Sequence, residues 1–185
     1  DRCVTFMERT GEARKGAIGR EEPTLEPDLA EVVIDPPDRT FSDTAIIEVG
    51  GRAVELAYLG RGHTDHDIVI TIPGTDVLFA GDLVEQGNVP FFGDGYPLDW
   101  VATSAALAAR VTGVIVPGHG NHLGRSFADD SATSVARLVD LARAVHGGEL
   151  ALDDAVAAHP FPELPPDHAI PAFERTLADL RGELD

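Results

Sequence analysis

Two histidines and one aspartate stand beside apolar segments of this chain, in a pattern that suits metal chemistry. His63 precedes the alternating apolar segment 68–72, and Asp82 and His119 each follow another apolar segment. Alternating apolar residues predict strands, and the turn residues 73–76 predict a hairpin between the first two of them. We therefore expect the three side chains in loops at one edge of a sheet, where a rigid scaffold can direct them at one point. Imidazole and carboxylate groups are ligand types that suit zinc.

The segments around these residues resemble the metallo-β-lactamase superfamily, a family of αββα metal-dependent hydrolases. The resemblance rests on Gly-His-Thr at 62–64, Phe-Ala-Gly-Asp at 79–82 and Pro-Gly-His-Gly at 117–120. The three motifs occur in the family's order and at roughly its spacing, so together they are far more specific than any one alone. The resemblance implies an α/β fold, a metallo-β-lactamase-like αββα sandwich, of which this chain supplies one sheet-plus-helices half and part of the other.

The resemblance also implies a zinc site that holds two ions. In the family the first histidine binds one zinc ion, the aspartate bridges both metal ions, and the last histidine binds the second ion. Carried over to this chain, these metal ligands are His63, Asp82 and His119. Iron is the alternative metal, as in the persulfide dioxygenases. His66 and His122, each three residues beyond a predicted ligand, are interpreted as supporting or solvent-exposed residues.

The family's His-x-His-x-Asp-His hallmark, which supplies most of the remaining ligands, does not occur in this sequence. None of the seven histidines makes that pattern, and the sequence opens at Asp1. We interpret the chain as the C-terminal part of a longer protein whose hallmark lies upstream, and the alternative is a natural metal-free relative. On the first interpretation the 185-residue chain alone binds zinc weakly and has no hydrolase activity, because each metal has too few ligands.

Asp82 narrows the function that the resemblance implies. Familiar class B β-lactamases have Cys or Ser at this position, whereas Asp is typical of thioesterase-like hydrolases such as hydroxyacylglutathione hydrolase. The implied reaction is the attack of a metal-bound hydroxide on a thioester, ester or lactam-like bond of a small-molecule substrate. Two alternatives stay open, a non-catalytic relative used for binding and an iron-dependent oxidoreductase related to the persulfide dioxygenases.

The segment after Asp82 is long and carries three aromatic residues, Phe91, Phe92 and Tyr96. Because it starts at a predicted metal ligand, it must run close to the site, and these rings are predicted to form one wall of a substrate pocket. The alternative is that the rings simply pack the loop onto the body of the protein.

The composition favours a soluble acidic enzyme and argues against two classes of partner. The formal net charge is −18, from 32 acidic and 14 basic residues, and a field of that sign repels nucleic acid and anionic membranes. No apolar run approaches the length of a membrane span, and Cys3 stands alone, so no internal disulfide can form. We expect one domain over residues 1–185 and a cytoplasmic location.

The remaining patterns predict the elements around the site. A hairpin turns at Gly50-Gly51, and Ser126 is the predicted N-cap of a helix that ends at Gly147. Periodicity and breakers further predict helices over 1–20, 98–110, 152–158 and 167–181, a strand over 31–34, a loop over 21–29 and a rigid linker over 160–166. If most of the first sheet lies upstream, as the first interpretation implies, one face of the strands 68–72 and 77–80 is expected to turn apolar side chains toward water. The alternative is that the chain closes its own core and covers both faces.

Overall fold

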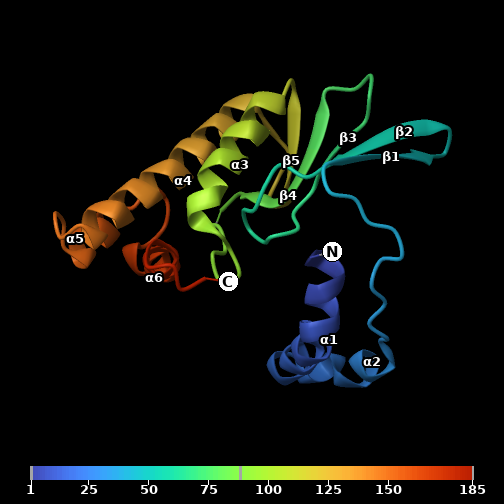
Figure 1. Cartoon of the computed structure of the whole chain (residues 1–185), viewed down its shortest axis with the longest axis horizontal. Coiled ribbons are helices and arrows are strands. Elements are labelled where there is room, and N and C mark those ends of the chain that lie inside the picture. The colour runs from blue at the N-terminus through green and yellow to red at the C-terminus, as the bar shows by residue number, and fades with distance from the viewer. Residues whose placement is uncertain (1, 88, 185) are drawn as a thin grey trace. The chain divides into compact units, whose positions relative to one another are not determined.

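The computed structural model describes residues 2–87 and 89–184. The chain separates into two compact units, Asp1–Ser42 and Asp43–Asp185 (Figure 1). The second unit contains the sheet and every residue predicted to bind metal or substrate.

The first unit is helical. It consists of α1 (Arg2–Glu21), the short 3₁₀ helix η1 (Pro23–Leu25) and α2 (Glu26–Glu31). The predicted loop over 21–29 is wrong. Pro23 and Pro27 lie in the first turns of η1 and α2, where a backbone N–H has no hydrogen-bond partner within the helix, so proline is tolerated there. The predicted strand over 31–34 is also wrong. Glu31 is the last residue of α2, and residues 32–34 pair with no strand among the described residues.

Six strands form one sheet in the second unit, in the order in which they occur in the sequence. They are β1 (Thr44–Val49), β2 (Arg52–Ala57), β3 (Val69–Thr71), β4 (Val77–Glu85), β5 (Val114–His119) and β6 (Leu123–Gly124). Neighbouring strands are antiparallel except β4 and β5, which are parallel. The predicted hairpin at Gly50-Gly51 is confirmed, and both glycines have the positive φ values, 59° and 80°, that a tight hairpin turn needs.

The strand order brings three chain segments to the same end of the sheet. Since β3 and β4 are antiparallel and β4 and β5 are parallel, the start of β3 lies at the same end as the ends of β4 and β5. Both strands continue further than the sequence predicts, so Asp82 and His119 lie within β4 and β5 rather than in the loops beyond them. A bulge at Gly81, with φ of 55° and register shifts on either side, redirects the end of β4.

Helices cover one face of this sheet. The parallel connection from β4 to β5 runs through α3 (Pro97–Arg110), and α4 (Arg125–His146) follows β6 and lies beside α3 (Figure 1). Their apolar faces meet Leu78 and Ile115 of the sheet in a core that excludes water from Leu107 and Leu138. Three further elements, α5 (Leu152–Ala157), η2 (Pro166–Ala169) and α6 (Ile170–Leu180), complete the helical layer.

One predicted helix start is wrong. The N-cap of α4 is Gly124 and not Ser126, because the helix begins directly after β6 and its cap makes no side-chain hydrogen bond. The predicted end at Gly147 is confirmed. None of the helices in the part of the chain that the structure describes is long and apolar enough to cross a membrane.

The opposite face of the sheet is apolar and open to solvent. Leu56, Ile70, Phe79 and Val116 are successive partners across four strands, and none of them is buried. The prediction of apolar side chains turned toward water is therefore confirmed, and the exposed fractions of Ile68 and Phe79 are 38% and 39%.

Candidate metal centre

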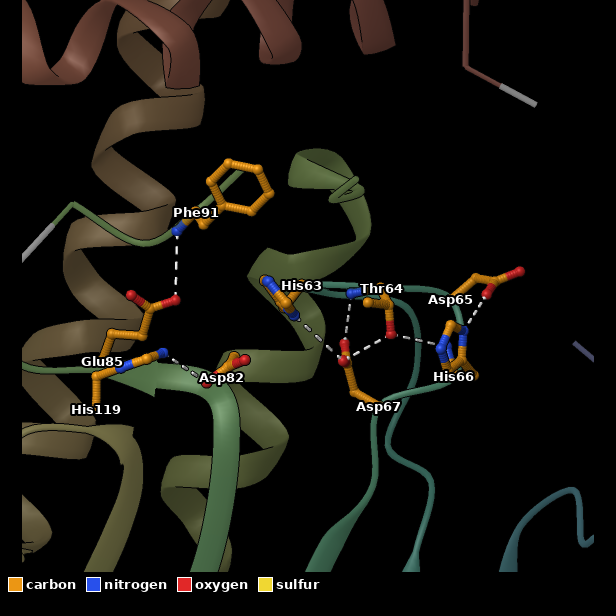
Figure 2. A network of polar contacts seen from close by, with 9 residues as sticks. All are labelled: His63, Thr64, Asp65, His66, Asp67, Asp82, Glu85, Phe91 and His119. Atoms are coloured by element: carbon orange, nitrogen blue, oxygen red, sulfur yellow. Dashed lines mark hydrogen bonds and ion pairs between the residues drawn. The ribbon is translucent and has the colours of Figure 1, made fainter. Parts of the chain in front are cut away.

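The structure brings Asp82 and His119 together at the ends of two parallel strands. The Nε2 atom of His119 lies 3.6 Å from Oδ1 of Asp82, and both side chains are reached by solvent (Figure 2). Gly118 makes this arrangement feasible, because a Cβ atom at that position would overlap the Asp82 carboxylate. A residue larger than glycine before His119 would therefore displace the carboxylate.

The separation of these two groups fits shared coordination of one metal ion. Zinc binds nitrogen and carboxylate oxygen at about 2.0–2.2 Å in tetrahedral geometry, so two ligands of one ion lie about 3.4 Å apart. The observed 3.6 Å is close to that value. Among residues 2–87 and 89–184, however, no group of three or more His, Cys, Asp and Glu side chains could hold a metal ion. The structure thus assembles two donors, and His63 does not join them.

His63 lies in the segment that precedes β3, at the same end of the sheet. Its Nδ1 atom is 3.8 Å from Oδ1 of Asp67, and its ring centroid is 6.1 Å from the rings of both Phe91 and Trp100. Burial lowers the pKa of His63, but the neighbouring carboxylates, Asp67 above all and also Asp82 and Glu85, outweigh burial and raise this pKa above 6.5. The electrostatic field of the Asp82 carboxylate therefore reaches His63 although the two side chains are not paired.

A hydrogen-bonded turn holds the His63 loop in shape. The Asp67 carboxylate accepts hydrogen bonds from the Thr64 backbone N–H (2.8 Å) and the Thr64 hydroxyl (2.7 Å), as Figure 2 shows. The Thr64 hydroxyl in turn accepts a hydrogen bond from the backbone N–H of His66, whose Nδ1 atom lies 2.7 Å from Asp65. His66 therefore takes part in the loop through its backbone N–H and its ring.

The same loop is fastened to α3. Thr103 donates a hydrogen bond from its hydroxyl to the Arg61 carbonyl at 2.7 Å. Gly62 packs so closely that an added Cβ atom would lie 2.5 Å from Cδ2 of Leu83 and 3.2 Å from Cδ1 of Trp100. The glycine of the Gly-His-Thr motif therefore has a packing role of its own, because a larger residue at position 62 would clash with Leu83 and Trp100.

Glu85 is a charged residue of this region that the sequence analysis did not single out. It is the last residue of β4, and its Cα atom is paired with that of His119 across the parallel strands. Burial raises the pKa of Glu85, as does the charge of Asp82, whereas the Phe91 N–H and the two histidines oppose the rise. The available signal was an acidic residue directly after the apolar pair Leu83-Val84, at the end of the strand that carries Asp82.

The three aromatic residues predicted to bind substrate have different surroundings. Phe92 is buried, with its ring centroid 4.9 Å from that of Trp100, so the packing alternative describes this residue. Tyr96 lies under the guanidinium of Arg61, whose Cζ is 4.3 Å from the ring centroid. Phe91 is 59% exposed, and it remains the ring with a free surface next to His63.

The molecule is an α/β protein whose single sheet brings Asp82 and His119 together at one end. Residues 5–119 match the family described as the metallo-beta-lactamase superfamily, and the chain belongs to this family. The α/β metallo-β-lactamase fold predicted from the sequence is confirmed.

Individual relatives agree with this assignment. The chain is 26% identical over 109 residues to the metallo-beta-lactamase type 2 of Bacteroides fragilis, covering 56% of this chain and 44% of the relative. It is 32% identical over 79 residues to the metallo-beta-lactamase type 2 of Bacillus cereus, covering 40% of this chain and 31% of the relative. The chain thus spans less than half the length of these curated relatives.

Solved structures show the same fold. The metallo-beta-lactamase from Pontibacter korlensis matches with a TM-score of 0.51 and 26% identity, over 65% of this chain and 61% of that one. A stereoselective inverting sec-alkylsulfatase from Pseudomonas sp. matches with a TM-score of 0.62 over 80% of this chain and 27% of that one. At 16% identity, the second likeness concerns the fold alone.

Proposed function

We propose that the protein is a metal-dependent hydrolase whose metal is held in part by Asp82 and His119. The observation that carries this proposal is the 3.6 Å separation of an imidazole nitrogen and a carboxylate oxygen at the ends of two parallel strands. Both residues lie in the segment that matches the family, and both side chains are reached by solvent, so an ion held between them would keep a position open for water or substrate.

Zinc is the proposed cofactor, and when bound it would polarise the bond to be cleaved and lower the pKa of water. The residues of the chain have separate tasks around it. Asp82 and His119 would supply a carboxylate oxygen and an imidazole nitrogen. His63, steered by the Asp67 carboxylate, offers a second imidazole at the same end of the sheet. The exposed ring of Phe91 shields His63 from one side.

The proposed substrates are small molecules with a thioester, ester or lactam-like bond. The aspartate at position 82 favours a thioester, whereas the curated relatives named above are metallo-beta-lactamases. The two bond types call for parallel assays on one preparation of protein, with a simple thioester and a chromogenic cephalosporin as substrates.

The test uses the protein in the full length that its gene encodes, with zinc or iron(II) added after removal of bound metal. We expect hydrolysis of at least one of the two substrates, and a loss of at least about 100-fold in kcat/KM for Asp82→Asn and for His119→Gln. Hydrolysis that survives both substitutions would contradict the proposal. Oxygen uptake by the iron-loaded protein, without hydrolysis of either substrate, would favour the oxidoreductase alternative.

A non-catalytic binding role is the second candidate. One observation favours it, the absence of a three-residue metal group among the residues that the structure describes. Metal analysis of the purified full-length protein separates the two, because a metal-free relative retains no zinc or iron after dialysis, whereas a hydrolase retains at least one ion.

A further inference from the structure

Glu85 and Phe91 form a pair next to the candidate metal centre that the proposed roles leave unused. The backbone N–H of Phe91 donates a hydrogen bond of 3.4 Å to Oε1 of Glu85, the last residue of β4 (Figure 2). The Phe91 ring lies 6.1 Å from the ring of His63, and the charges of His63 and His119 both act on Glu85. The exposed aromatic ring thus lies beside His63, and the Glu85 carboxylate lies within electrostatic reach of His63 and His119.

Both members of this pair are held in place by their neighbours. The residue after Glu85, Gln86, donates its backbone N–H to the His119 carbonyl at 3.1 Å and accepts a hydrogen bond from the Asn121 N–H at 2.9 Å. Gly93 lies against the Phe91 ring, and an added Cβ atom there would lie 2.7 Å from Cε1 of the ring. The position of the ring therefore depends on glycine at 93.

Three carboxylates act in this region, those of Asp67, Asp82 and Glu85, and the imidazoles of His63 and His119 act against them. Of the arginines near the aromatic segment, Arg61 forms an ion pair with Asp99 and Arg175 donates to the Gly95 carbonyl at 2.8 Å. A carboxylate beside an aromatic face is the usual recognition chemistry for an alkylammonium group, which gains from the charge and from the ring together.

We propose that Glu85 and Phe91 form a subsite that binds a positively charged group of the substrate, such as an alkylammonium. The proposal rests on the proposed hydrolase function for its biological meaning, since a subsite next to the metal centre selects among substrates. It assigns specificity to two residues that are neither metal ligands nor reacting groups. A substrate with an anionic group at this position would meet the Glu85 carboxylate.

Binding is tested first, without any reaction. Tetramethylammonium chloride is titrated into the protein, and the backbone amide signal of Phe91 is followed by NMR, with sodium chloride as the ionic-strength control. We expect a saturable shift that weakens roughly three- to tenfold in affinity for Glu85→Gln and for Phe91→Leu. Gly93→Ala, which moves the ring and keeps both functional groups, is expected to weaken binding as well. Glu48→Gln, at an exposed glutamate of β1, is the matched control and leaves binding unchanged.

Hydrolysis is tested second, with two thioesters of the same shape. Acetylthiocholine carries a quaternary ammonium group, and S-(3,3-dimethylbutyl) thioacetate has a neutral carbon in its place. The protein is expected to favour the cationic thioester in kcat/KM, and Glu85→Gln is expected to reduce that preference by roughly three- to tenfold while the neutral thioester is affected less.

The binding experiment and the hydrolysis experiment distinguish failure of the subsite from failure of the proposed hydrolase function. A saturable tetramethylammonium shift without cleavage of either thioester supports the subsite and counts against the thioesterase form of the proposed function. Cleavage without any tetramethylammonium shift, or a shift that is the same in Glu85→Gln, overturns the subsite and leaves the hydrolase intact.

Discussion

The Nε2 atom of His119 lies 3.6 Å from Oδ1 of Asp82, although α3 separates the two strands that carry these residues in the sequence. Three local features produce this relationship. The strands β4 and β5 are parallel neighbours, a bulge at Gly81 redirects the end of β4, and Gly118 leaves room for the carboxylate. Each of these features can be altered separately.

Gly118→Ala should displace the Asp82 carboxylate and weaken metal binding. A methyl group at 118 would occupy the space of that carboxylate, whereas the backbone of Gly118 is not in the left-handed region that only glycine favours. We expect the affinity for zinc to fall by about tenfold or more, with little change in the circular dichroism spectrum. The matched control is Gly124→Ala, since an added Cβ atom at 124 meets nothing within 4 Å. Equal zinc affinities of the two variants would show that Gly118 does not position Asp82.

Asp67→Asn should loosen the His63 loop. The Asp67 carboxylate accepts from both the Thr64 backbone N–H and the Thr64 hydroxyl, whereas asparagine has one acceptor oxygen for these two donors, and the side chain is largely buried. We expect a loss of about 1–3 kcal/mol in the free energy of unfolding, measured with urea. Asp65→Asn, in the same loop, is the control and should cost less, because Asp65 contacts the ring of His66 rather than the Thr64 turn.

The same variant should lower the pKa of His63, which the Asp67 carboxylate helps to raise above 6.5. The folded state binds the His63 proton more tightly than the unfolded state, so the resulting stability is fully present below about pH 6.5 and is lost as the pH rises through the folded pKa. NMR titration of the His63 ring in the wild-type protein and in Asp67→Asn measures the change. An unchanged titration curve would show that Asp67 does not act on this ring.

Glu85→Gln should change how stability depends on pH. Burial raises the pKa of Glu85 above its ordinary value of 4.5, so the folded state binds this proton more tightly than the unfolded state. The stabilising effect of the protonated form is complete below pH 4.5 and is lost as the pH rises through the folded pKa. We therefore expect the free energy of unfolding of Glu85→Gln to rise relative to that of the wild-type protein as the pH increases above 4.5. Parallel pH profiles of the two proteins would contradict this expectation.

The open face of the sheet should bind a hydrophobic dye. Contiguous apolar surface of this kind is uncommon on a monomeric protein, and Phe79 lies near its centre between Ile70 and Val116. Phe79→Ser should lower the fluorescence of bound 8-anilinonaphthalene-1-sulfonate. The control is Val33→Ser, because Val33 is 83% exposed but belongs to the first unit. Equal fluorescence of both variants would mean that the dye binds elsewhere.

Local sequence patterns predicted most of the second unit because those patterns and the final packing agree. The β3–β4 hairpin has alternating residues and a four-residue turn, and Leu78 and Val69 are buried where the alternation requires. The helix over 98–110 also formed with nearly the predicted bounds. In the first unit the prolines misled the prediction, since Pro23 begins a helical turn instead of marking a loop.

The candidate site was predicted only in part, because its geometry depends on where strands end and bend. The motif around His63 gave no sign that Asp67 would be its partner, since that contact comes from the shape of the loop. The motif around Asp82 gave no sign of the Gly81 bulge or of the extension of β4 to Glu85. A shift of one residue in the position of the bulge or of the strand end would turn different side chains toward His119, and local sequence patterns do not predict these positions.

The measurement that most directly tests shared metal binding by Asp82 and His119 is a calorimetric titration of zinc into the 185-residue chain, Asp82→Asn, His119→Gln and the double variant. We predict weak binding by the chain, a nearly complete loss in each single variant, and no further loss in the double variant, because two ligands of one ion act as a unit. Tight stoichiometric binding of two zinc ions by this chain, or additive losses from two independent sites, would contradict the account.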